Sequence, residues 1–377
     1  MNWWRSPILQ SLFAIALILM ATNAAVMAQF SDLKASDAQA DSAPALAGTL
    51  LDQAAWRAYK ARFVTEQGRV VDTGNAQISH SEGQGYGLVL AVAAGDRDAF
   101  DRIWGWTRAN LMVRGDELLA WRWEPDKRPA IADMNNATDG DLLVAWALTE
   151  ADSTWKNTSY RIAARRIAVE VGRKLILPQT QHGSLLLPAL AGFAAEERQD
   201  GPVVNLSYWV FPALDRLPTI APEFDWAALS RSGYELLRKA RFGAQGLPVE
   251  WTALGASDPH PATGFAPSFA YNAIRIPLYL AWSGIGRESD LAPFVALWAK
   301  HPARGLPLID TAGGRQIGWL EEKGYAAIAD LAACAASGTK LPASFKAANI
   351  AENYYPATLH LLAQIAAQMR YPSCLRG

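Results

Sequence analysis

The sequence has few cysteines and histidines, and its charges nearly balance. Its 377 residues include two cysteines and five histidines, and the formal net charge is −1. Neither cysteine has the spacing of a metal site. No basic stripe runs along the chain, which argues against a nucleic-acid partner. The cysteines, Cys334 and Cys374, could form a disulfide in an exported protein or remain two free buried thiols.

Long hydrophobic runs are absent beyond the N-terminus. Residues 1–5 carry positive charge, residues 8–20 are apolar, and small polar residues follow. This pattern predicts a signal peptide over residues 1–28, cleaved after Ala28, and a protein exported to the periplasm or medium. An uncleaved anchor is the alternative, but the apolar run is short for a span of ~20 residues. No other segment predicts a membrane contact.

Alternating strand patterns and internal repeats are also lacking, and helical periodicity dominates. Residues 29–47, rich in Ala, Ser and Asp, indicate a flexible lead-in. No comparable linker divides residues 48–377, which we expect to be one domain. The predicted helices are 48–66, 82–94, 98–111, 139–151, 159–175, 185–195, 205–215, 225–241, 267–283, 289–300, 319–335 and 354–369. They predict an all-α toroid of inner and outer helices, with small hairpins at 68–73 and 306–311.

The segment SHSEGQGYGLVLAVAAG, residues 79–95, places a carboxylate at a helix start. Ser81 is a good N-cap, and Gln84 three residues later completes a capping box. Glu82 then lies in the first turn. The glycines differ from a dinucleotide fingerprint, because the last spacing is one residue short and no strand precedes them. The segment therefore predicts a helix that begins with an acid.

Three further helices begin with polar groups and continue as apolar stripes. They are NNATDGDLLVAWAL from 135, where Thr138 is the predicted cap, NLSYWVFPAL from 205, and APSFAYNAIRIPLYLAW from 266. Their polar residues are Asp139, Tyr208, Tyr271, Asn272 and Arg275. If the inner helices run parallel in a toroid, these ends converge on one face and form a cleft.

The fifteen tryptophans supply flat apolar faces that suit stacking against sugar rings. Each tryptophan could equally pack in the core. The candidates for the cleft are Trp104, Trp106, Trp121, Trp123 and Trp209. Paired carboxylates beside aromatic platforms, in an exported protein without a metal site, indicate glycoside hydrolysis.

The segments SEGQGYG, NNATDGDLLVAWAL, NLSYWVFPAL, YNAIRIPLYLAW and ENYYPATLHLLA, in this order, resemble glycoside hydrolase family 8. The resemblance runs from about residue 50 to 370 and is closest to the endo-β-1,4-glucanases associated with bacterial cellulose synthesis. It implies an (α/α)6 barrel, an inverting mechanism, a cellulose-type β-glucan as substrate and no cofactor. It also implies an association with the cellulose synthesis machinery.

The resemblance assigns roles to individual residues. It implies that Glu82 is the general acid and that Asp139 binds the sugar at the cleavage point and helps it distort. Tyr208, Tyr271 and Arg275 match residues that line the centre of the cleft. We expect the faces of Trp121, Trp123 and Trp209 to hold further sugars.

The sequence departs from the family pattern at Asn272, where many members carry the aspartate that acts as general base. A neutral amide can orient a water but cannot take its proton. One interpretation is that another carboxylate is the base, as in chitosan-cleaving members. The positional candidates are Asp141, Glu250, Asp258, Glu288, Asp290 and Asp310.

Two more interpretations of Asn272 need no base. The chain could be an Asp→Asn variant made to trap substrate, or a weakly active or inactive glucan-binding accessory protein of cellulose export. A lyase on a similar toroid would use His80 or His182, although a lone histidine is more commonly a surface or core residue.

Overall fold

The computed structural model describes residues 45–46, 50–255, 258–300, 304–348 and 350–376. The expected signal peptide and nearly all of the expected lead-in lie outside these residues. The residues described from Ala45 onward belong to one compact unit. Within them, no helix is long and apolar enough to cross a membrane.

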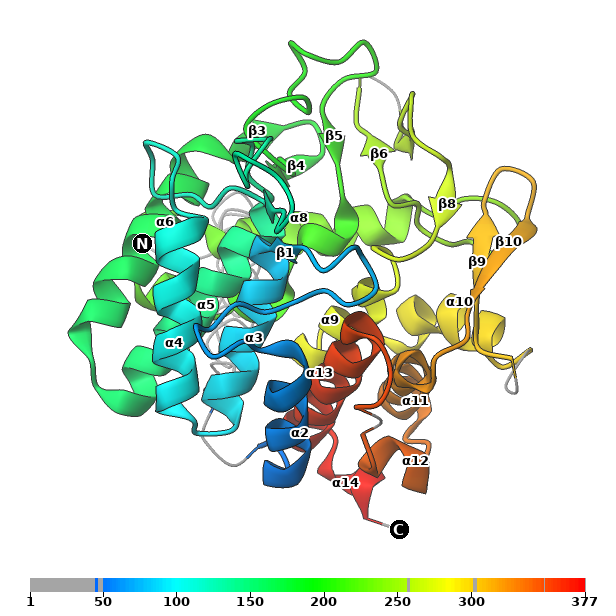
Figure 1. The fold of residues 1–377 in the computed structure, drawn as a ribbon. Helices are drawn as coiled ribbons and strands as arrows, with labels where there is room; N and C mark the ends of the chain where they lie inside the picture. The colour runs from blue at the N-terminus through cyan, green and yellow to red at the C-terminus, as the bar shows by residue number, and fades with distance from the viewer. Residues whose placement is uncertain (1–44, 47–49, 256–257, 301–303, 349, 377) are drawn as a thin grey trace, which may run out of the picture. The chain divides into compact units, whose positions relative to one another are not determined.

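Helices make up most of the regular structure (Figure 1). They are α2 Gln53–Phe63, α3 Ser81–Ala93, α4 Arg97–Asn110, α5 Thr138–Trp155, α6 Thr158–Lys174, α7 Phe211–Leu214, α8 Trp226–Lys239, α9 Arg275–Ser283, α10 Glu288–Trp298, α11 Lys323–Ser337, α12 Ala343–Lys346, α13 Tyr354–Arg370 and α14 Pro372–Leu375. Two 3₁₀ turns, Leu206–Tyr208 and Leu217–Thr219, flank α7.

Short antiparallel ladders connect the helices. The strands are β1 Ser79–His80, β2 Arg122–Trp123, β3 Ile176–Thr180, β4 Gly183–Leu186, β5 Val203–Val204, β6 Thr252–Ala253, β7 His260–Pro261, β8 Ser268–Phe269, β9 Leu306–Asp310 and β10 Arg315–Leu320. They pair as β1–β2, β3–β4, β5–β6–β7 and β8–β9–β10. In Figure 1, β5 and β6 lie at one end of the helices, and α12 and α14 lie at the other.

Alternate helices form a closed inner ring. Helices α3, α5, α7, α9, α11 and α13 each contact the next, and α13 returns to contact α3. Outside this ring, α4, α6 and α8 pack against the inner helix that precedes them, and α10 packs against α11. The predicted all-α fold, an (α/α)6 barrel, is confirmed.

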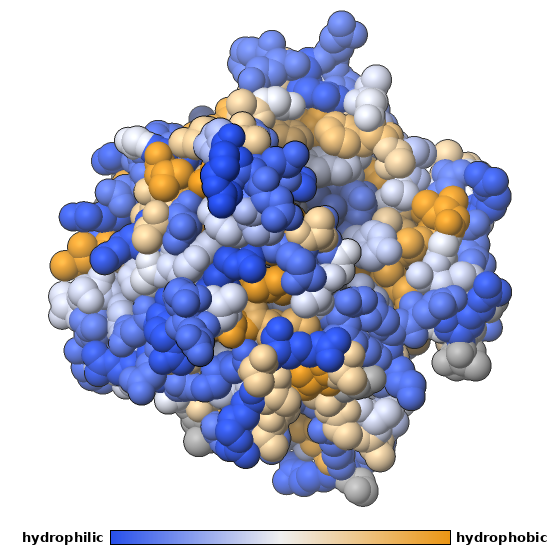
Figure 2. All heavy atoms as spheres, viewed as in Figure 1, coloured by the Kyte–Doolittle hydropathy of each residue, from blue (hydrophilic) through white to orange (hydrophobic). Residues whose placement is uncertain are grey.

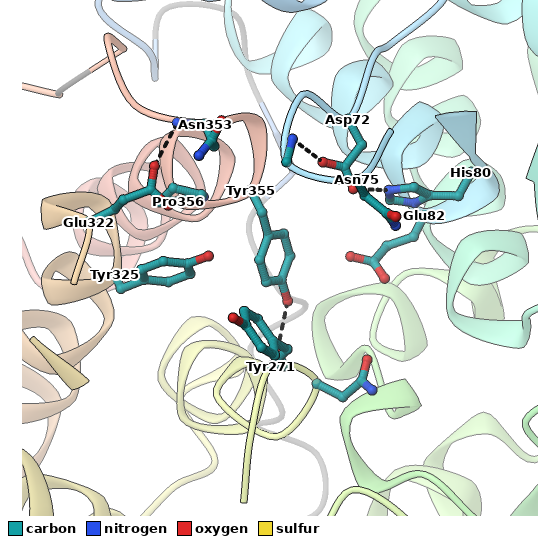
Figure 3. A pocket seen from close by; sticks show the side chains of 12 residues that line it. Asp72, Asn75, His80, Glu82, Tyr271, Glu322, Tyr325, Asn353, Tyr355 and Pro356 are labelled. Carbon is teal, nitrogen blue, oxygen red and sulfur yellow. Dashed lines mark hydrogen bonds and ion pairs between the residues drawn. The ribbon is translucent and has the colours of Figure 1, made fainter. Parts of the chain in front are cut away.

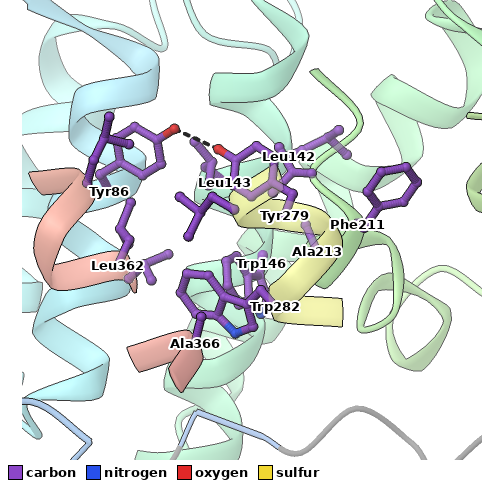
Figure 4. Close-up of a cluster of buried hydrophobic side chains, with 14 of the residues drawn as sticks. Tyr86, Leu142, Leu143, Trp146, Phe211, Ala213, Tyr279, Trp282, Leu362 and Ala366 are labelled. Atoms are coloured by element: carbon purple, nitrogen blue, oxygen red, sulfur yellow. Dashed lines mark hydrogen bonds between the residues drawn. The ribbon is translucent and has the colours of Figure 1, made fainter. Parts of the chain in front are cut away.

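Side chains fill the middle of the ring (Figure 4). Trp146 and Trp282 meet edge to face with ring centroids 5.2 Å apart. The hydroxyls of Tyr86 and Tyr279 are hydrogen-bonded at 2.6 Å. The ring therefore encloses a packed core rather than a pore.

Two glycines bring α3 and α5 unusually close together. A Cβ added at Gly85 would lie 2.5 Å from Leu143 Cβ, and one at Gly140 would lie 2.1 Å from Ser81 Oγ. Both are shorter than real Cβ contacts, so only glycine permits this approach. The beginnings of α3 and α5 are thus side by side, and so are Glu82 and Asp139 in their first turns.

The predicted caps of these helices are wrong. His80, not Ser81, is the N-cap of α3, and the N-cap position of α5 is Ala137, which makes no side-chain cap bond. Gln84 turns away from its own helix to accept from Val70 N and donate to Thr107 Oγ1. Tertiary hydrogen bonds of Gln84 thus replace the predicted capping box, and the local cap moves one residue earlier, to His80.

Several predicted helices are shorter or absent. Residues 185–195 continue β4 into bends that contain Pro188 and a left-handed Gly192, with φ +92°. Residues 267–274 form β8 and a turn, so that helix begins only at Arg275. Pairing of β8 with β9 outweighs helical periodicity here.

The predicted hairpin at 306–311 is confirmed, because β9 pairs with β10. Only isolated bridges form within 68–73. A disulfide joins Cys334 in α11 to Cys374 in α14, so the two cysteines are bonded rather than free.

Candidate active site

The polar residues at the beginnings of the inner helices meet at Arg275. This residue opens α9 and is fully buried. Its Nη1 lies 2.9 Å from Glu82 Oε2 and 2.8 Å from Asp139 Oδ2. Its Nη2 donates to Ser207 Oγ and to Asn272 Oδ1, each at 2.9 Å. One guanidinium therefore ties together residues from four of the segments singled out in the sequence.

The two carboxylates at Arg275 differ in exposure. Asp139 is buried, and its Oδ1 accepts from Gly140 N at 2.8 Å. Burial raises the pKa of Asp139, the neighbouring Glu82 raises it further, and Arg275 opposes both effects. Glu82 is the one residue of α3 that is not buried. It is the acid that a ligand in the cleft can reach.

A cavity of about 520 Å³ opens beside Glu82. Figure 3 shows the Glu82 carboxylate pointing into this cavity, with Tyr355 and Tyr271 across from it. Tyr271 is 52% exposed, and Tyr355 donates from its hydroxyl to Tyr271 O at 3.0 Å. Asn272 also lines the cavity. Figure 2 shows that this face of the molecule is hollowed, with polar and apolar side chains intermixed.

A second cavity, of about 280 Å³, is lined by Trp121, Phe193, Tyr208 and Trp251 among others. Trp251 stacks with Phe193 at 5.2 Å between centroids and meets Tyr208 edge-on at 6.2 Å. The Trp121 indole donates to Asp133 at 2.8 Å. Aromatic rings fixed in this way provide flat apolar surfaces for sugars. Tyr208 is also close to the site charges, and its ring lies 5.7 Å from the Arg275 guanidinium.

The structure corrects part of the tryptophan assignment. Trp209 is fully buried, and its indole donates to Leu229 O at 2.9 Å, so it belongs to the core. Trp123 packs edge-on against Trp106 at 5.5 Å, with Arg69 over its ring, and it lines neither cavity. Of the three tryptophans expected to bind sugar, only Trp121 lines one. Trp104 is also buried.

The sequence reasoning missed Trp251, Tyr325 and Tyr355, which line the two cavities. Tyr355 follows the rule that found the others, since it lies at the polar beginning of an apolar helix, α13. Trp251 lies in a loop without periodicity, and no sequence pattern marks it.

Asn272 is held in one orientation. Arginine can only donate, so the amide oxygen of Asn272 must face Arg275, and its NH₂ group is left to donate to Glu250. Its backbone N–H donates to Glu250 Oε1 at 2.6 Å. Burial raises the pKa of Glu250, and the hydrogen bonds from Asn272 together with Arg275 oppose that rise.

The remaining carboxylates considered as bases lie elsewhere. Asp141 is fully buried and accepts from Leu119 N and from the Asn136 amide. Glu288 and Asp290 belong to the outer helix α10. Asp258 is exposed, and Asp310 accepts from Ala312 N at the end of β9. Of the six, Glu250 is the one that contacts Asn272. Within the described residues, no cluster of His, Cys, Asp or Glu could hold a metal ion.

Comparison with known proteins defines the class. Residues 20–369 match the family described as Glycosyl hydrolases family 8. The chain is 35% identical over 314 residues to a probable endoglucanase of Novacetimonas hansenii. The aligned region covers 82% of this chain and 89% of that protein. It is 36% identical over 281 residues to an endoglucanase of Cellulomonas uda, and the aligned region covers 74% of this chain and 77% of that protein.

A solved structure agrees with this result. The endo-β-1,4-glucanase of Acetobacter xylinum superposes with a TM-score of 0.75 at 34% identity, over 83% of this chain and 96% of that chain. The chain belongs to glycosyl hydrolases family 8. It is a glycoside hydrolase, and the sequence resemblance to that family is confirmed.

Proposed function

We propose that the enzyme cuts internal bonds of cellulose-type β-1,4-glucan chains with inversion, using Glu82 as general acid. It is an endo-1,4-β-glucanase, like the relatives named above. One observation carries the catalytic assignment. Glu82 is the half-buried member of a carboxylate pair bound to one buried arginine, and it lines a cavity beside aromatic residues.

Glu82 protonates the leaving oxygen of the glycosidic bond in this proposal. Its Oε2 faces Arg275, which leaves Oε1 to carry the transferred proton into the cavity. Asp139 is buried and lines neither cavity, so its role in the proposal is to fix Arg275, because it binds the same Nη1 as Glu82. Tyr208, Tyr271 and Trp121 contact sugars on either side of the acid.

Glu250 is the general base in this proposal. Asn272 presents its NH₂ group and orients the attacking water, which it cannot deprotonate. Burial raises the pKa of Glu250 and improves it as a base, while the backbone N–H of Asn272, which it accepts, opposes that rise. The neighbours of the pair line the two cavities, since Tyr271 borders the first and Trp251 the second.

The second candidate function is a weakly active or inactive glucan-binding accessory protein. Asn272 favours it, because binding alone requires no base. An intact acid pair at Arg275 favours the enzyme.

The first proposal also places the protein outside the cytoplasm and in association with cellulose synthesis, as the N-terminal pattern and the sequence resemblance suggest. The Cys334–Cys374 disulfide supports an oxidising compartment.

Hydrolysis of carboxymethyl-cellulose by the purified chain tests the proposal, with soluble chitosan as a second substrate. We expect cleavage of the glucan by the parent, and losses of ~10²–10⁴ in rate for both Glu82→Gln and Glu250→Gln. Asn272→Asp should restore activity to Glu250→Gln by supplying a second base. A parent that binds but does not cut, and that Asn272→Asp activates, would establish the accessory function instead.

A further inference from the structure

His80 occupies the N-cap of α3, directly before the acid. Its backbone is extended, with φ −137° and ψ 158°, and its Nδ1 accepts the N–H of Gly83 at 2.9 Å. A ring nitrogen accepts a hydrogen bond only when it carries no proton. The first turn of α3, which contains Glu82, therefore depends on an unprotonated Nδ1.

The other nitrogen of His80 faces a carboxylate. Nε2 lies 3.5 Å from Asp72 Oδ2, while Asp72 Oδ1 accepts the N–H of Gly74 at 3.0 Å. An ionised carboxylate only accepts, so Nε2 must carry the proton. The two contacts together select one neutral tautomer.

We propose that His80 is a positioning residue for the acid: its neutral Nε2–H tautomer closes the first turn of α3 around Glu82, and protonation at Nδ1 opens that turn and lowers turnover. This inference rests on the proposed role of Glu82. His80 itself acts through the backbone of α3 and is not assigned a contact with substrate.

The surroundings of His80 bring its protonation within reach. Asp72 faces it from the preceding loop, Glu82 lies on α3, and Asp139 lies on α5. Burial lowers the pKa of His80, but the hydrogen bond to Asp72 and the charges of these three carboxylates outweigh burial and raise it above its ordinary value.

Two other elements pack against the histidine. The Tyr354 ring at the start of α13 meets the imidazole edge-on at 6.0 Å. Arg122 on β2 pairs with His80 across the ladder, and its guanidinium binds Glu124. His80 and Asp72 both line the first cavity, so protons can reach them from solvent. Once Nδ1 is protonated, two donors face each other at the start of α3 and the cap is lost.

The tautomer can be measured directly. The protein contains five histidines, and a sample labelled with ¹⁵N in histidine gives few imidazole signals, of which His80→Asn identifies one. We expect the Nε2–H tautomer above neutral pH, with Nδ1 unprotonated. An Nδ1–H tautomer would overturn the proposal whatever the activity of the variants.

The pH profile of kcat on a soluble β-1,4-glucan oligosaccharide tests the consequence. Asparagine is a strong N-cap that does not titrate, so His80→Asn should retain kcat near neutral pH and shift the acid limb to lower pH. His80→Ala removes the acceptor, and we expect kcat near neutral pH to fall about five- to tenfold with less change in KM, and the difference from the parent to vanish at acid pH, where the parent has lost the cap too. An acid limb in His80→Asn identical to that of the parent would refute the proposal.

A matched control separates helix capping in general from capping at the acid. Asp225 caps the outer helix α8 by accepting from Ala228 N at 2.8 Å. Asp225→Ala should lower thermal stability but leave the acid limb in place. Glu82→Gln separates the two proposals. If it remains active, the role of Glu82 fails, whereas if it is inactive and the His80 variants behave as the parent, only the positioning role fails.

Discussion

Arg275 determines which residues of the cleft can do chemistry. It binds Glu82, Asp139 and Asn272 at once while fully buried, so it fixes the proposed acid, its partner carboxylate and the amide of Asn272 relative to one another. Because it occupies the amide oxygen of Asn272, it also excludes that side chain as an acceptor. We therefore propose Glu250 as the base, because it is the carboxylate in contact with Asn272.

Asp141 shows that a carboxylate in a motif can serve the fold instead of the reaction. It is fully buried, and desolvation raises its pKa to about 8, against the hydrogen bonds from Asn136 and Leu119. The folded chain thus retains a proton that the unfolded chain loses near pH 4. Its contribution to stability is complete below about pH 4 and is lost as the pH rises toward 8.

We therefore expect the free energy of unfolding to fall between pH 5 and pH 8 by up to about 1.4 kcal/mol per pH unit from this group. Asp141→Asn keeps an acceptor for Leu119 N but does not titrate, so it should flatten the dependence. Urea unfolding at intervals across this range measures the slope. Equal slopes for parent and variant would show that Asp141 is ionised in the folded chain.

At the scale of elements, the contact between α3 and α5 aligns the two acids. Gly140 permits it, because a Cβ there would meet Ser81 Oγ at 2.1 Å and Glu82 N at 2.8 Å. Helix geometry alone does not place Glu82 beside Asp139. The close approach of the two helix beginnings does so.

Gly140→Ala should therefore force α3 and α5 apart, destabilise the fold by about 1–3 kcal/mol and lower kcat more than KM. Gly105 in α4 is the matched control, since a Cβ there would meet nothing within 4 Å. Gly105→Ala should stabilise by up to about 1 kcal/mol and leave kcat unchanged. Thermal unfolding and steady-state kinetics on the two variants decide the matter. Equal kcat values for Gly140→Ala and Gly105→Ala would contradict this role for the contact.

The sequence predicted elements best where a helix has both a period and a polar beginning. The segments that start at Glu82, Asp139 and Tyr354 follow this rule, and each lies close to its predicted position. The prediction failed where partners distant in sequence decide. The Gln84 side chain hydrogen-bonds to Val70 and Thr107 instead of capping α3. The residues before Arg275 form β8, which pairs with β9.

The site shows the same limit. Convergence of Glu82, Asp139, Asn272 and Arg275 was expected from parallel inner helices, and the contacts at Arg275 confirm that these residues meet. The exposure of individual tryptophans could not be predicted from the sequence. Trp121 and Trp209 are the same residue type near polar segments, yet only Trp121 borders a cavity, and Trp209 is buried. Trp251 and Glu250 lie in an irregular loop whose path depends on the ladder of β5 and β6.

At the scale of the whole molecule, the candidate active site and the disulfide lie at opposite ends of the helices. Tyr355 and Tyr325, near the beginnings of α13 and α11, line the first cavity. Cys334 lies near the end of α11 and Cys374 lies beyond the end of α13. The disulfide therefore fixes the end of the ring that is remote from the acids.

The double variant Cys334→Ser, Cys374→Ser should accordingly lose about 2–4 kcal/mol of stability with kcat and KM unchanged at low temperature. The bridge spans a separation of 40 residues, which restricts the unfolded chain. Thermal unfolding, and kinetics well below the unfolding midpoint, would check both parts. A drop in kcat while the protein is fully folded would show that the two ends are coupled.

Closure of the ring also constrains the order in which the chain can fold. Helix α13 completes the circle by packing against α3, and Tyr59 and Thr358 share a hydrogen bond of 2.9 Å across 299 positions of sequence. Contacts of such long separation form late, since loop closure must precede them. During synthesis, the inner ring cannot close until α13 is available to pack against α3. A chain still held by the ribosome would thus have an open ring, with the first inner helices lacking their last partner.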